Sequence, residues 1–195
     1  HPLKALTSEE SEKIVRAELE EGERLLWHGR PDPKAAAFHN ARIVFIGAVI
    51  AIFALWWMLA AADYGIPDFS QSMRIRIIES VAFLVLMVGL GLCYTPRIAY
   101  KRALGTLYAL TDRRCLIISM NGNKVVQSYR QEDIGEIEWM IGPKKTDHVA
   151  FASPEATVRK GVSTIRRAGF YNIADGKAVE QMLREVFHKP YTGGS

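Results

Sequence analysis

The stretch YALTDRRCLIIS, residues 108–119, holds two apolar runs on either side of four polar residues, TDRR. Apolar runs rich in β-branched and aromatic residues around a short polar segment predict a β-hairpin. Thr111 and Asp112 have side chains that hydrogen-bond backbone groups in tight turns, which favours a structural role for this segment. The alternative is a cationic tip that touches phospholipid or a partner protein. We expect Arg114 to pair with an acidic neighbour inside the domain and Arg113 to face solvent.

Further strands are expected after this hairpin. Asn121-Gly122 is a strong hairpin signal, so residues 124–130 are expected to return as a third strand. Residues 142–145 turn the chain into another strand at 149–152, and one or two more strands are expected within 162–173.

Residues 136–141 alternate in character. Ile137, Trp139 and Ile141 fall on one face, with Glu136, Glu138 and Met140 on the other, a pattern typical of a half-buried strand.

The last regular element is predicted to be a helix after the natural N-cap residue Asp175. Its apolar positions recur at helical spacing on one face: Val179, Met182, Leu183, Val186 and Phe187. Several antiparallel strands followed by one amphipathic helix indicate a small barrel or bent sheet that the helix closes. The fold class expected for this part of the chain is therefore α+β.

Residues 43–62 form a run of twenty residues without a charge. At 1.5 Å per residue such a helix is about 30 Å long, the thickness of the hydrocarbon core of a bilayer. Trp56 and Trp57 lie toward its end, where indole rings favour the membrane interface. We expect a transmembrane helix here.

Residues 80–95 form a second apolar run, which the isoleucines before it can extend and which Pro96 is expected to end. Glu79 is expected near the membrane interface; the alternative is a functional carboxylate inside the membrane. The short segment between the two runs makes them an antiparallel hairpin.

Basic residues are more numerous outside this hairpin than in its linker. Arg74 and Arg76 belong to the linker side, whereas Arg42 and Arg97 flank the outer ends, and these four residues are expected at the membrane interface. By the positive-inside bias both termini should be cytoplasmic. The basic residues outside the hairpin are Arg24, Arg30, Lys34, Arg42, Arg97, Lys101, Arg102, Arg113 and Arg114.

The N-terminal segment is predicted to begin with a short acidic amphipathic helix. Thr7 and Glu10 have the spacing of a capping box, and Gly22 can end the helix. Residues 25–27 then lead into a rigid, turn-rich connector at 29–33. The helix has two possible docking sites, a partner protein or the C-terminal domain of the same chain. The first residues carry no basic segment followed by an apolar stretch, so no signal peptide is expected.

Composition argues against several classes of protein. The net charge is +4, and the basic residues are spread along the 195 residues of the chain. Nucleic-acid binders concentrate their basic residues in a stripe, so nucleic-acid binding is not expected. Cys93 and Cys115 have no ligand-like spacing and are expected to be buried, reduced thiols, and the five histidines are scattered, so we expect neither a metal nor another cofactor.

Candidate catalytic groups occur only singly. They are His148 beside Asp147 and the pair Glu132-Asp133, which are expected to be solvated turn residues. No catalytic residue is predicted, and the chain is not expected to be an enzyme.

The sequence as a whole resembles a known family, the bacterial pleckstrin-homology-like (PH-like) domains found next to membrane hairpins. The resemblance covers roughly residues 25–189, and its most specific part is the pattern Tyr-x-Leu-Thr-Asp-x-Arg. It is carried by LLWHGRPDP before the hairpin, LYALTDRRCLIIS and DHVAFAS after it, and FYNIADGKAVEQMLREVF near the end. The resemblance implies a seven-stranded, strongly bent sheet capped by a C-terminal helix, and it implies no catalytic residues. Eukaryotic relatives bind phosphoinositides through a long basic loop between the first two strands, and residues 111–114 are interpreted as a shortened form of that loop.

The expected organisation is an N-terminal helix and connector at 1–40, a transmembrane hairpin at 41–97, a cytoplasmic PH-like domain at 98–190 and a tail at 191–195. The expected location is the bacterial cytoplasmic (inner) membrane, as a multi-pass protein. The expected function is that of a non-catalytic accessory or scaffolding subunit of a larger membrane protein complex. The alternative is binding of anionic lipid headgroups, for which the basic candidates, also able to face a partner, are Arg113, Arg114, Lys144, Lys145, Arg166 and Arg167, with Arg159-Lys160 as a further pair.

Overall fold

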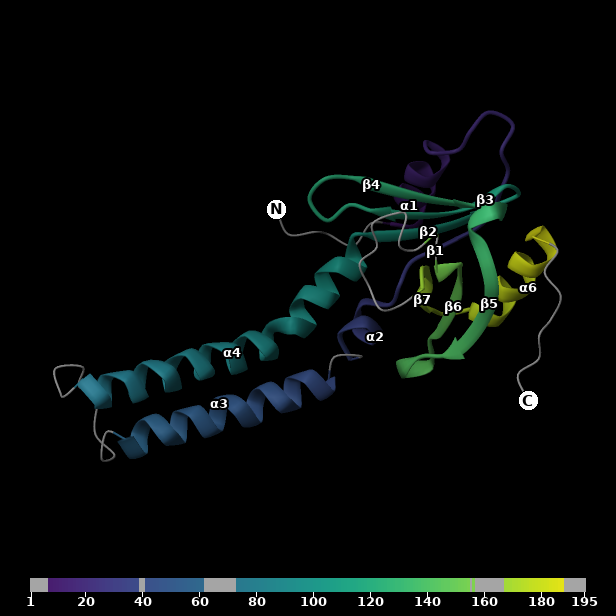
Figure 1. Ribbon diagram of the computed structural model, residues 1–195. Helices are drawn as coiled ribbons and strands as arrows, with labels where there is room; N and C mark the ends of the chain where they lie inside the picture. The colour runs from purple at the N-terminus through teal and green to yellow at the C-terminus, as the bar shows by residue number, and fades with distance from the viewer. Residues whose placement is uncertain (1–6, 39–40, 62–72, 155, 157–166, 188–195) are drawn as a thin grey trace, which may run out of the picture. The chain divides into compact units, whose positions relative to one another are not determined.

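The computed structural model describes residues 7–38, 41–61, 73–154, 156 and 167–187 (Figure 1). The chain divides into two compact units, each described by itself below. Unit 1 combines residues 1–36 with residues 100–195, and unit 2 comprises residues 37–99. Segments from both sides of the apolar hairpin therefore build one domain. The short helix α2 (Pro33–Phe38) lies where the chain passes from unit 1 to unit 2.

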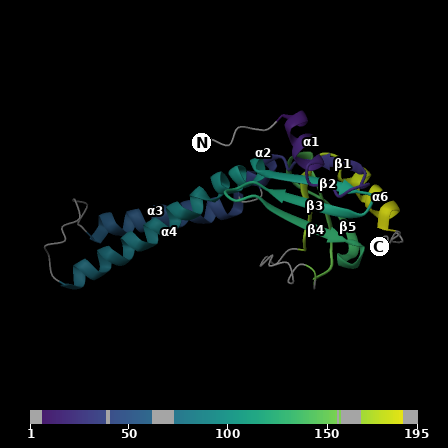
Figure 2. The ribbon, with the colours of Figure 1, turned by 90° about the horizontal axis from the view of Figure 1, so that it is seen from above.

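The first sheet of unit 1 has four antiparallel strands in the order β1-β2-β3-β4. The hairpin predicted around residues 111–114 is formed by β2 (Thr106–Thr111) and β3 (Arg114–Ser119). The predicted third strand is β4 (Val125–Arg130), which follows the Asn121-Gly122 turn, where Gly122 has the positive φ that favours glycine. Figure 2 shows β2, β3 and β4 side by side.

Strand β1 (Leu25–Gly29) corrects the interpretation of the N-terminal segment as helix and connector alone. It pairs antiparallel with β2, with Trp27 opposite Leu110 and Gly29 opposite Tyr108. Because β1 precedes the apolar hairpin and β2 follows it, the connection between the first two strands is the hairpin itself. The interpretation of residues 111–114 as a shortened loop between the first two strands was therefore wrong, since this turn joins β2 to β3.

The second sheet of unit 1 has three antiparallel strands in the order β5-β6-β7. These are β5 (Ile134–Ile141), β6 (Asp147–Ala152) and β7 (Gly169–Ile173). Two single turns of 3-10 helix precede β5 and β6, η1 (Gln131–Asp133) and η2 (Pro143–Lys145). The part of the predicted region 162–173 that precedes residue 167 lies outside the described residues.

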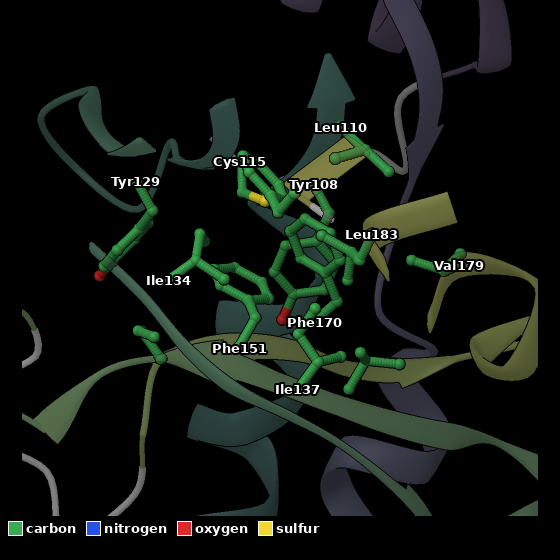
Figure 3. Packing of buried hydrophobic residues seen from close by; sticks show 14 of the residues in the cluster. Tyr108, Leu110, Cys115, Tyr129, Ile134, Ile137, Phe151, Phe170, Val179 and Leu183 are labelled. Atoms are coloured by element: carbon green, nitrogen blue, oxygen red, sulfur yellow. The ribbon is translucent and has the colours of Figure 1, made fainter. Parts of the chain in front are cut away.

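The main core lies between the two sheets and helix α6 (Gly176–Phe187), as Figure 3 shows. Phe151 and Phe170 meet edge to face with ring centroids 4.8 Å apart, and Tyr129 packs against Phe151 at 5.7 Å. The predicted apolar face of α6 is confirmed, because Val179, Leu183 and Phe187 are buried in this core and Met182 and Val186 pack against it. The α+β fold class holds for unit 1.

Helix α1 (Ser8–Arg16) begins with the predicted capping box, in which Thr7 accepts from the Glu10 amide and the Glu10 carboxylate accepts from the Thr7 amide. It ends at Arg16 rather than at Gly22. Val15 is completely buried on the face of the first sheet opposite the main core, against Leu107, Ala109, Leu116 and Ile118. Of the two docking sites considered for this helix, the domain of the same chain is the one observed.

Unit 2 consists of α3 (Ala41–Ala61) packed on α4 (Met73–Leu104), whose last turn belongs to unit 1. The helices approach closely at Gly47 and Gly89, where a Cβ on Gly89 would lie 2.9 Å from the Gly47 carbonyl oxygen and 2.8 Å from the Ala51 amide nitrogen. Gly89 therefore lies at a close contact between the two helices. Gly91 has no neighbour within 4 Å of such a Cβ.

Pro96 does not end α4, contrary to the prediction from sequence. A proline inside a helix removes the hydrogen bond to the carbonyl four residues earlier, here that of Leu92. The Thr95 hydroxyl donates to the Leu92 carbonyl at 2.8 Å and replaces the missing amide. Substitution by a hydroxyl donor of this kind lets a helix continue through proline.

Both long helices are long and apolar enough to cross a membrane. Only 17% of the apolar window of α3 and 11% of that of α4 are buried, whereas a core helix of a soluble domain is mostly buried. Large apolar side chains such as Phe45, Ile52 and Leu84 are more than half exposed.

Candidate functional site

The turn between β2 and β3 is organised by Thr111. Its hydroxyl oxygen accepts from the amides of Arg113 at 3.2 Å and Arg114 at 3.0 Å, and the hydroxyl donates to Glu23 Oε1 at 2.6 Å. Asp112 Oδ1 accepts from the Arg24 amide at 3.0 Å, and the Asp112 amide donates to the Arg24 carbonyl at 3.1 Å. The structural role predicted for Thr111 and Asp112 is confirmed.

Glu23 and Arg114 form a buried, bidentate ion pair beneath this turn. Arg114 Nε donates to Glu23 Oε1 and Arg114 Nη2 donates to Glu23 Oε2, both at 2.9 Å. The Glu23 side chain has no exposed surface and that of Arg114 is 11% exposed. The guanidinium also lies 3.1 Å from Glu20 Oε1 and donates to the Glu18 carbonyl at 3.0 Å, so its charge is balanced inside the protein.

The electrostatics of this pair follow from its contacts. Burial alone would raise the pKa of the Glu23 carboxyl, but hydrogen bonds from Arg114, Thr111 and the Glu20 amide, together with the charge of Arg114, lower that pKa to about 2. The hydrogen bond to Glu23 raises the pKa of Arg114 in turn. Both groups are therefore charged at neutral pH.

The position of Arg114 corrects its assignment as a lipid- or partner-facing residue. Its guanidinium group contacts Glu20 and Glu23 of the N-terminal segment. This agrees with the expectation that Arg114 pairs with an acidic neighbour inside the domain. Arg113 is exposed, in agreement with the prediction.

The turn between β5 and β6 carries Lys144 and Lys145, both exposed. Thr146 closes this turn, because its hydroxyl donates to the Pro143 carbonyl at 2.6 Å and its carbonyl accepts from the Gly142 amide at 2.7 Å. Lys144 and Lys145 have φ values of 55° and 60°, in the left-handed region that residues with a Cβ rarely adopt. Both lysines are exposed, so they remain candidates for facing a lipid surface or a partner protein.

The guanidinium group of Arg167 binds other groups of unit 1. Its Nε donates to the Ala152 carbonyl at 2.9 Å, Nη2 donates to the Glu136 carbonyl, and Nη1 lies 3.7 Å from Glu138 Oε2. Its side chain is 25% exposed, so its main contacts hold β5 and β6 together. Arg166 and the pair Arg159-Lys160 lie outside the described residues.

Two of the residues considered as catalytic groups, His148 and Asp133, are buried rather than in solvated turns. His148 is buried in β6, and its Nδ1 accepts from the Asn172 amide at 3.0 Å. Asp133 is buried in η1, where its carboxylate accepts from the Arg130 amide at 3.2 Å. The expectation of a solvated turn residue was wrong for these two side chains, whereas Glu132 is exposed. Within the described residues, no three His, Cys, Asp or Glu side chains form a group that could hold a metal ion.

The interface residues expected in the hairpin fall into two sets. Arg42 and Arg97 are exposed and lie toward one end, since Cys93 Sγ contacts the Val44 carbonyl at 3.7 Å and so fixes the register of the two helices. Trp56 and Trp57 are about half exposed toward the other end of α3. Arg74 and Arg76 lie in the first turns of α4, and their side chains are outside the described part.

Glu79 lies toward the same end of the hairpin as the two tryptophans. It is 1% exposed, and its Oε2 makes no hydrogen bond with the described residues. Arg97 follows it by eighteen positions, about 27 Å along a helix, close to the thickness of a hydrocarbon core. This length agrees with an interfacial position for Glu79 if Arg97 lies at the opposite interface.

Both cysteines are free, as predicted from their spacing. Cys115 is completely buried and Cys93 is partly exposed. Burial raises the pKa of the Cys115 thiol well above its usual range, which keeps this side chain an inert part of the core.

Glu23 is the residue that sequence analysis missed. Its signal was available in principle, because an arginine inside a strand needs a carboxylate partner when it is buried.

In comparisons with known proteins, no family model matches the chain, and no curated protein or solved structure matches it. The functional conclusion rests on the residues themselves.

Proposed function

We propose that this protein is a membrane-anchored, non-catalytic module that acts as an accessory or scaffolding subunit of a larger membrane protein complex. Its α3–α4 hairpin spans the bacterial cytoplasmic membrane, and unit 1 is a PH-like domain on the cytoplasmic side. Four plus three antiparallel strands followed by one helix support the PH-like interpretation, since the family has a bent seven-stranded sheet and a C-terminal helix.

The single observation that carries the proposal is the exposed apolar surface of α3 and α4. A soluble protein rarely leaves such a contiguous apolar surface in water, whereas a bilayer solvates it. The glycine contact between the helices fits a membrane setting, because helix pairs in lipid associate through small residues that allow close backbone approach.

The pairing of β1 with β2 supports a single side for both ends of the hairpin. α3 follows β1 in the chain and α4 leads into β2, and these two strands are hydrogen-bonded neighbours. Two crossings return the chain to the side from which it started, so β1 can pair with β2 if both helices cross but not if only one does. The basic residues at the outer ends of the hairpin favour the cytoplasm as that side.

A groove on the hairpin supports association with another membrane protein. It has a volume of about 320 Å³, an almost wholly apolar lining and a floor that includes the small residues Ala54 and Ala82. A bulky side chain from a neighbouring helix fits such a groove. The lining residues are Phe53, Ala54, Trp57, Ile77, Val81, Ala82 and Val85.

Purification of the full chain in mild detergent, followed by mass spectrometry of co-purifying proteins, tests the proposed function. The expected result is a stoichiometric integral membrane partner. Ala54→Leu fills the floor of the groove and should release that partner, while Leu84→Ala, at an exposed position outside the groove lining, should retain it. A protein that purifies alone under several mild detergents contradicts the subunit role.

Reporter fusions test the arrangement in the membrane separately. Cytoplasmic reporters at both termini are expected to be active, and a periplasmic reporter inserted between residues 62 and 72 is expected to be active as well. Activity of a periplasmic reporter at either terminus would contradict the arrangement.

A further inference from the structure

The two long helices of unit 2 pack against each other along one face of each helix, and Figures 1 and 2 show them side by side. In the described part of unit 2, the buried positions recur at intervals of three, four or seven residues, as positions on a single helix face do. We call these positions the seam. They are Gly47, Ala51 and Ala54 in α3 and Glu79, Ala82 and Gly89 in α4. Glu79 is the one member of the seam that is neither glycine nor alanine.

Glu79 lies at the linker end of the seam. Ala82, three positions later, is buried on the same face of α4. The contact between Cys93 and Val44 sets the antiparallel register of the two helices, and by that register Glu79 lies opposite the α3 turn around Met58. Met58 is itself half-buried. The carboxyl group is therefore enclosed between two apolar helices.

The described part of the hairpin holds nothing that balances a charge on Glu79. The residue is 1% exposed, and its Oε2 makes no hydrogen bond with the described residues. Residues 43–61 contain no charged side chain, and their only side-chain hydrogen-bond donors are the indoles of Trp56 and Trp57, which are about half exposed. An ionised carboxylate without a partner is strongly disfavoured in such a place, whereas the neutral acid is tolerated.

The remaining charged groups near Glu79 in the sequence belong to α4 and to the linker. Arg74 and Arg76 precede it on α4, and Asp63 and Asp68 lie in the linker. All four side chains are outside the described residues.

We propose that Glu79 is a proton-binding site of the membrane hairpin. A proton needs a single oxygen atom, whereas a metal ion needs several oxygen ligands, and no three acidic, His or Cys side chains of the described residues form a group that could supply them. The proton comes from the aqueous phase at the linker end, binds to the carboxylate, and returns to the same phase when it is released. The inference rests on the proposed membrane position of α3 and α4, because a bilayer around the seam keeps water away from the carboxyl group.

Proton release from Glu79 changes the groove to which the proposed function assigns a partner. Ala54 and Ala82 belong both to the seam and to the lining of that groove. An ionised Glu79 draws water into the linker end of the seam, because a charge in an apolar setting is stabilised by local hydration. The helices then separate beside the two alanines, so the proton on Glu79 regulates the shape of the groove.

Infrared spectroscopy of the full chain in nanodiscs tests proton binding. A protonated carboxyl group has a C=O stretching band above the amide I band, and an ionised carboxylate lacks it. We expect this band in the unmodified chain at neutral pH, its reversible loss as the pH rises, and its absence in Glu79→Gln. Glu132→Gln removes an exposed carboxylate of unit 1 and should leave the band unchanged.

Pulsed electron-spin resonance measures the opening of the seam. The full chain carries Cys93→Ser, and Cys115 is buried and takes no label. Nitroxides are attached at Leu55→Cys and Phe83→Cys, which are half exposed and lie next to the alanines shared by the seam and the groove. The distance between these two labels is recorded as the pH rises.

The expected result is a longer mean distance between the labels at positions 55 and 83 once the infrared band is lost. A second pair at Val49→Cys and Leu90→Cys, half exposed beside the glycine contact, is the matched control and should keep its distance. With Glu79→Gln in the same background, both distances should be independent of pH.

Three outcomes overturn the proposal in different ways. Absence of the band at neutral pH, in protein that floats with vesicles after alkaline washing, overturns the proton site and leaves the membrane anchoring. Loss of the band with rising pH without a change in the distance between positions 55 and 83 overturns the regulation of the groove. Failure of the protein to float overturns the anchoring and the proton site together.

Discussion

Glu23 and Arg114 bind one another through two hydrogen bonds of 2.9 Å although 91 positions separate them in the sequence. One residue precedes the apolar hairpin and the other follows it, so this pair joins the two halves of unit 1. A buried ion pair adds little net stability over an apolar pair, but its two charges depend strongly on each other. The N-terminal segment therefore supplies the carboxylate that compensates the buried charge of Arg114.

Glu23→Gln is expected to destabilise unit 1 by about 3–5 kcal/mol, because it leaves the Arg114 charge buried without its partner. Thermal or chemical unfolding of the purified full chain measures the loss. Arg113→Gln, one residue away and exposed, should change stability by less than about 0.5 kcal/mol. Equal effects of the two substitutions would show that the ion pair has no special importance.

The stability of the protein should fall in acid through Glu23. Its pKa is about 2 in the folded protein against 4.5 in its ordinary state, so the carboxylate stabilises the fold fully above the higher value and loses this contribution as pH falls toward the lower one. The difference in unfolding free energy between the unmodified protein and Glu23→Gln should shrink by about 3 kcal/mol between neutral pH and pH 2. A difference that stays constant with pH would contradict the lowered pKa.

Gly89→Ala is expected to push the two long helices apart, since the new methyl group would meet backbone atoms of Gly47 and Ala51 at 2.8–2.9 Å. Overpacking of this kind costs about 1–3 kcal/mol. Thermal unfolding in detergent, followed by circular dichroism, measures the change. Gly91→Ala is the matched control, because its methyl group meets nothing within 4 Å and should leave the melting temperature the same or higher.

Thr95→Val should destabilise α4 by about 1 kcal/mol, because the Leu92 carbonyl loses the hydroxyl that replaces the amide missing at Pro96. In a Pro96→Ala background the alanine amide can donate to that carbonyl, so Thr95→Val should have little further effect. A double-mutant cycle measures this coupling. Additive effects of the two substitutions would mean that the hydroxyl does not compensate for the proline.

Val15→Ala is expected to cost about 2 kcal/mol, since Val15 is completely buried where α1 packs on the first sheet. Lys13→Ala, on the exposed side of the same helix, serves as the control. Unfolding of the full chain in the absence of any partner provides the measurement. If Val15→Ala matters only when a partner is present, α1 docks on that partner instead.

Local patterns predicted much of unit 1. The hairpin at residues 108–119, the Asn121-Gly122 turn and the apolar face of the C-terminal helix each follow from neighbouring residues, so the sequence around them was sufficient. The long apolar helices were predicted for the same reason. The boundary at Pro96 was missed because the compensating donor is a threonine side chain, which a rule about proline alone leaves out.

Strand β1 and the identity of the partner of Arg114 needed information that no local pattern holds. LLWHG is five residues long and lacks a clean alternation, and its pairing partner lies beyond the whole hairpin. The exposed end of β5, where Ile141 is 76% exposed, was missed for a different reason. Alternation predicts which side chains share a face, but the extent of the core decides how far along the strand that face is covered.

The insertion of the hairpin between β1 and β2 has a consequence for biogenesis. During translation, β1 with its apolar Leu25-Leu26-Trp27 run is synthesised before its pairing partner β2. The two strands cannot pair until residues 30–105 have also been synthesised, which takes roughly ten seconds at ordinary elongation rates. In the proposed membrane arrangement, insertion of only one of the two helices would leave β1 and β2 on opposite sides of the membrane, so that Arg114 could not bind Glu23. Domain closure would then act as a proofreading step for membrane insertion, with misinserted chains left unfolded for the quality-control proteases.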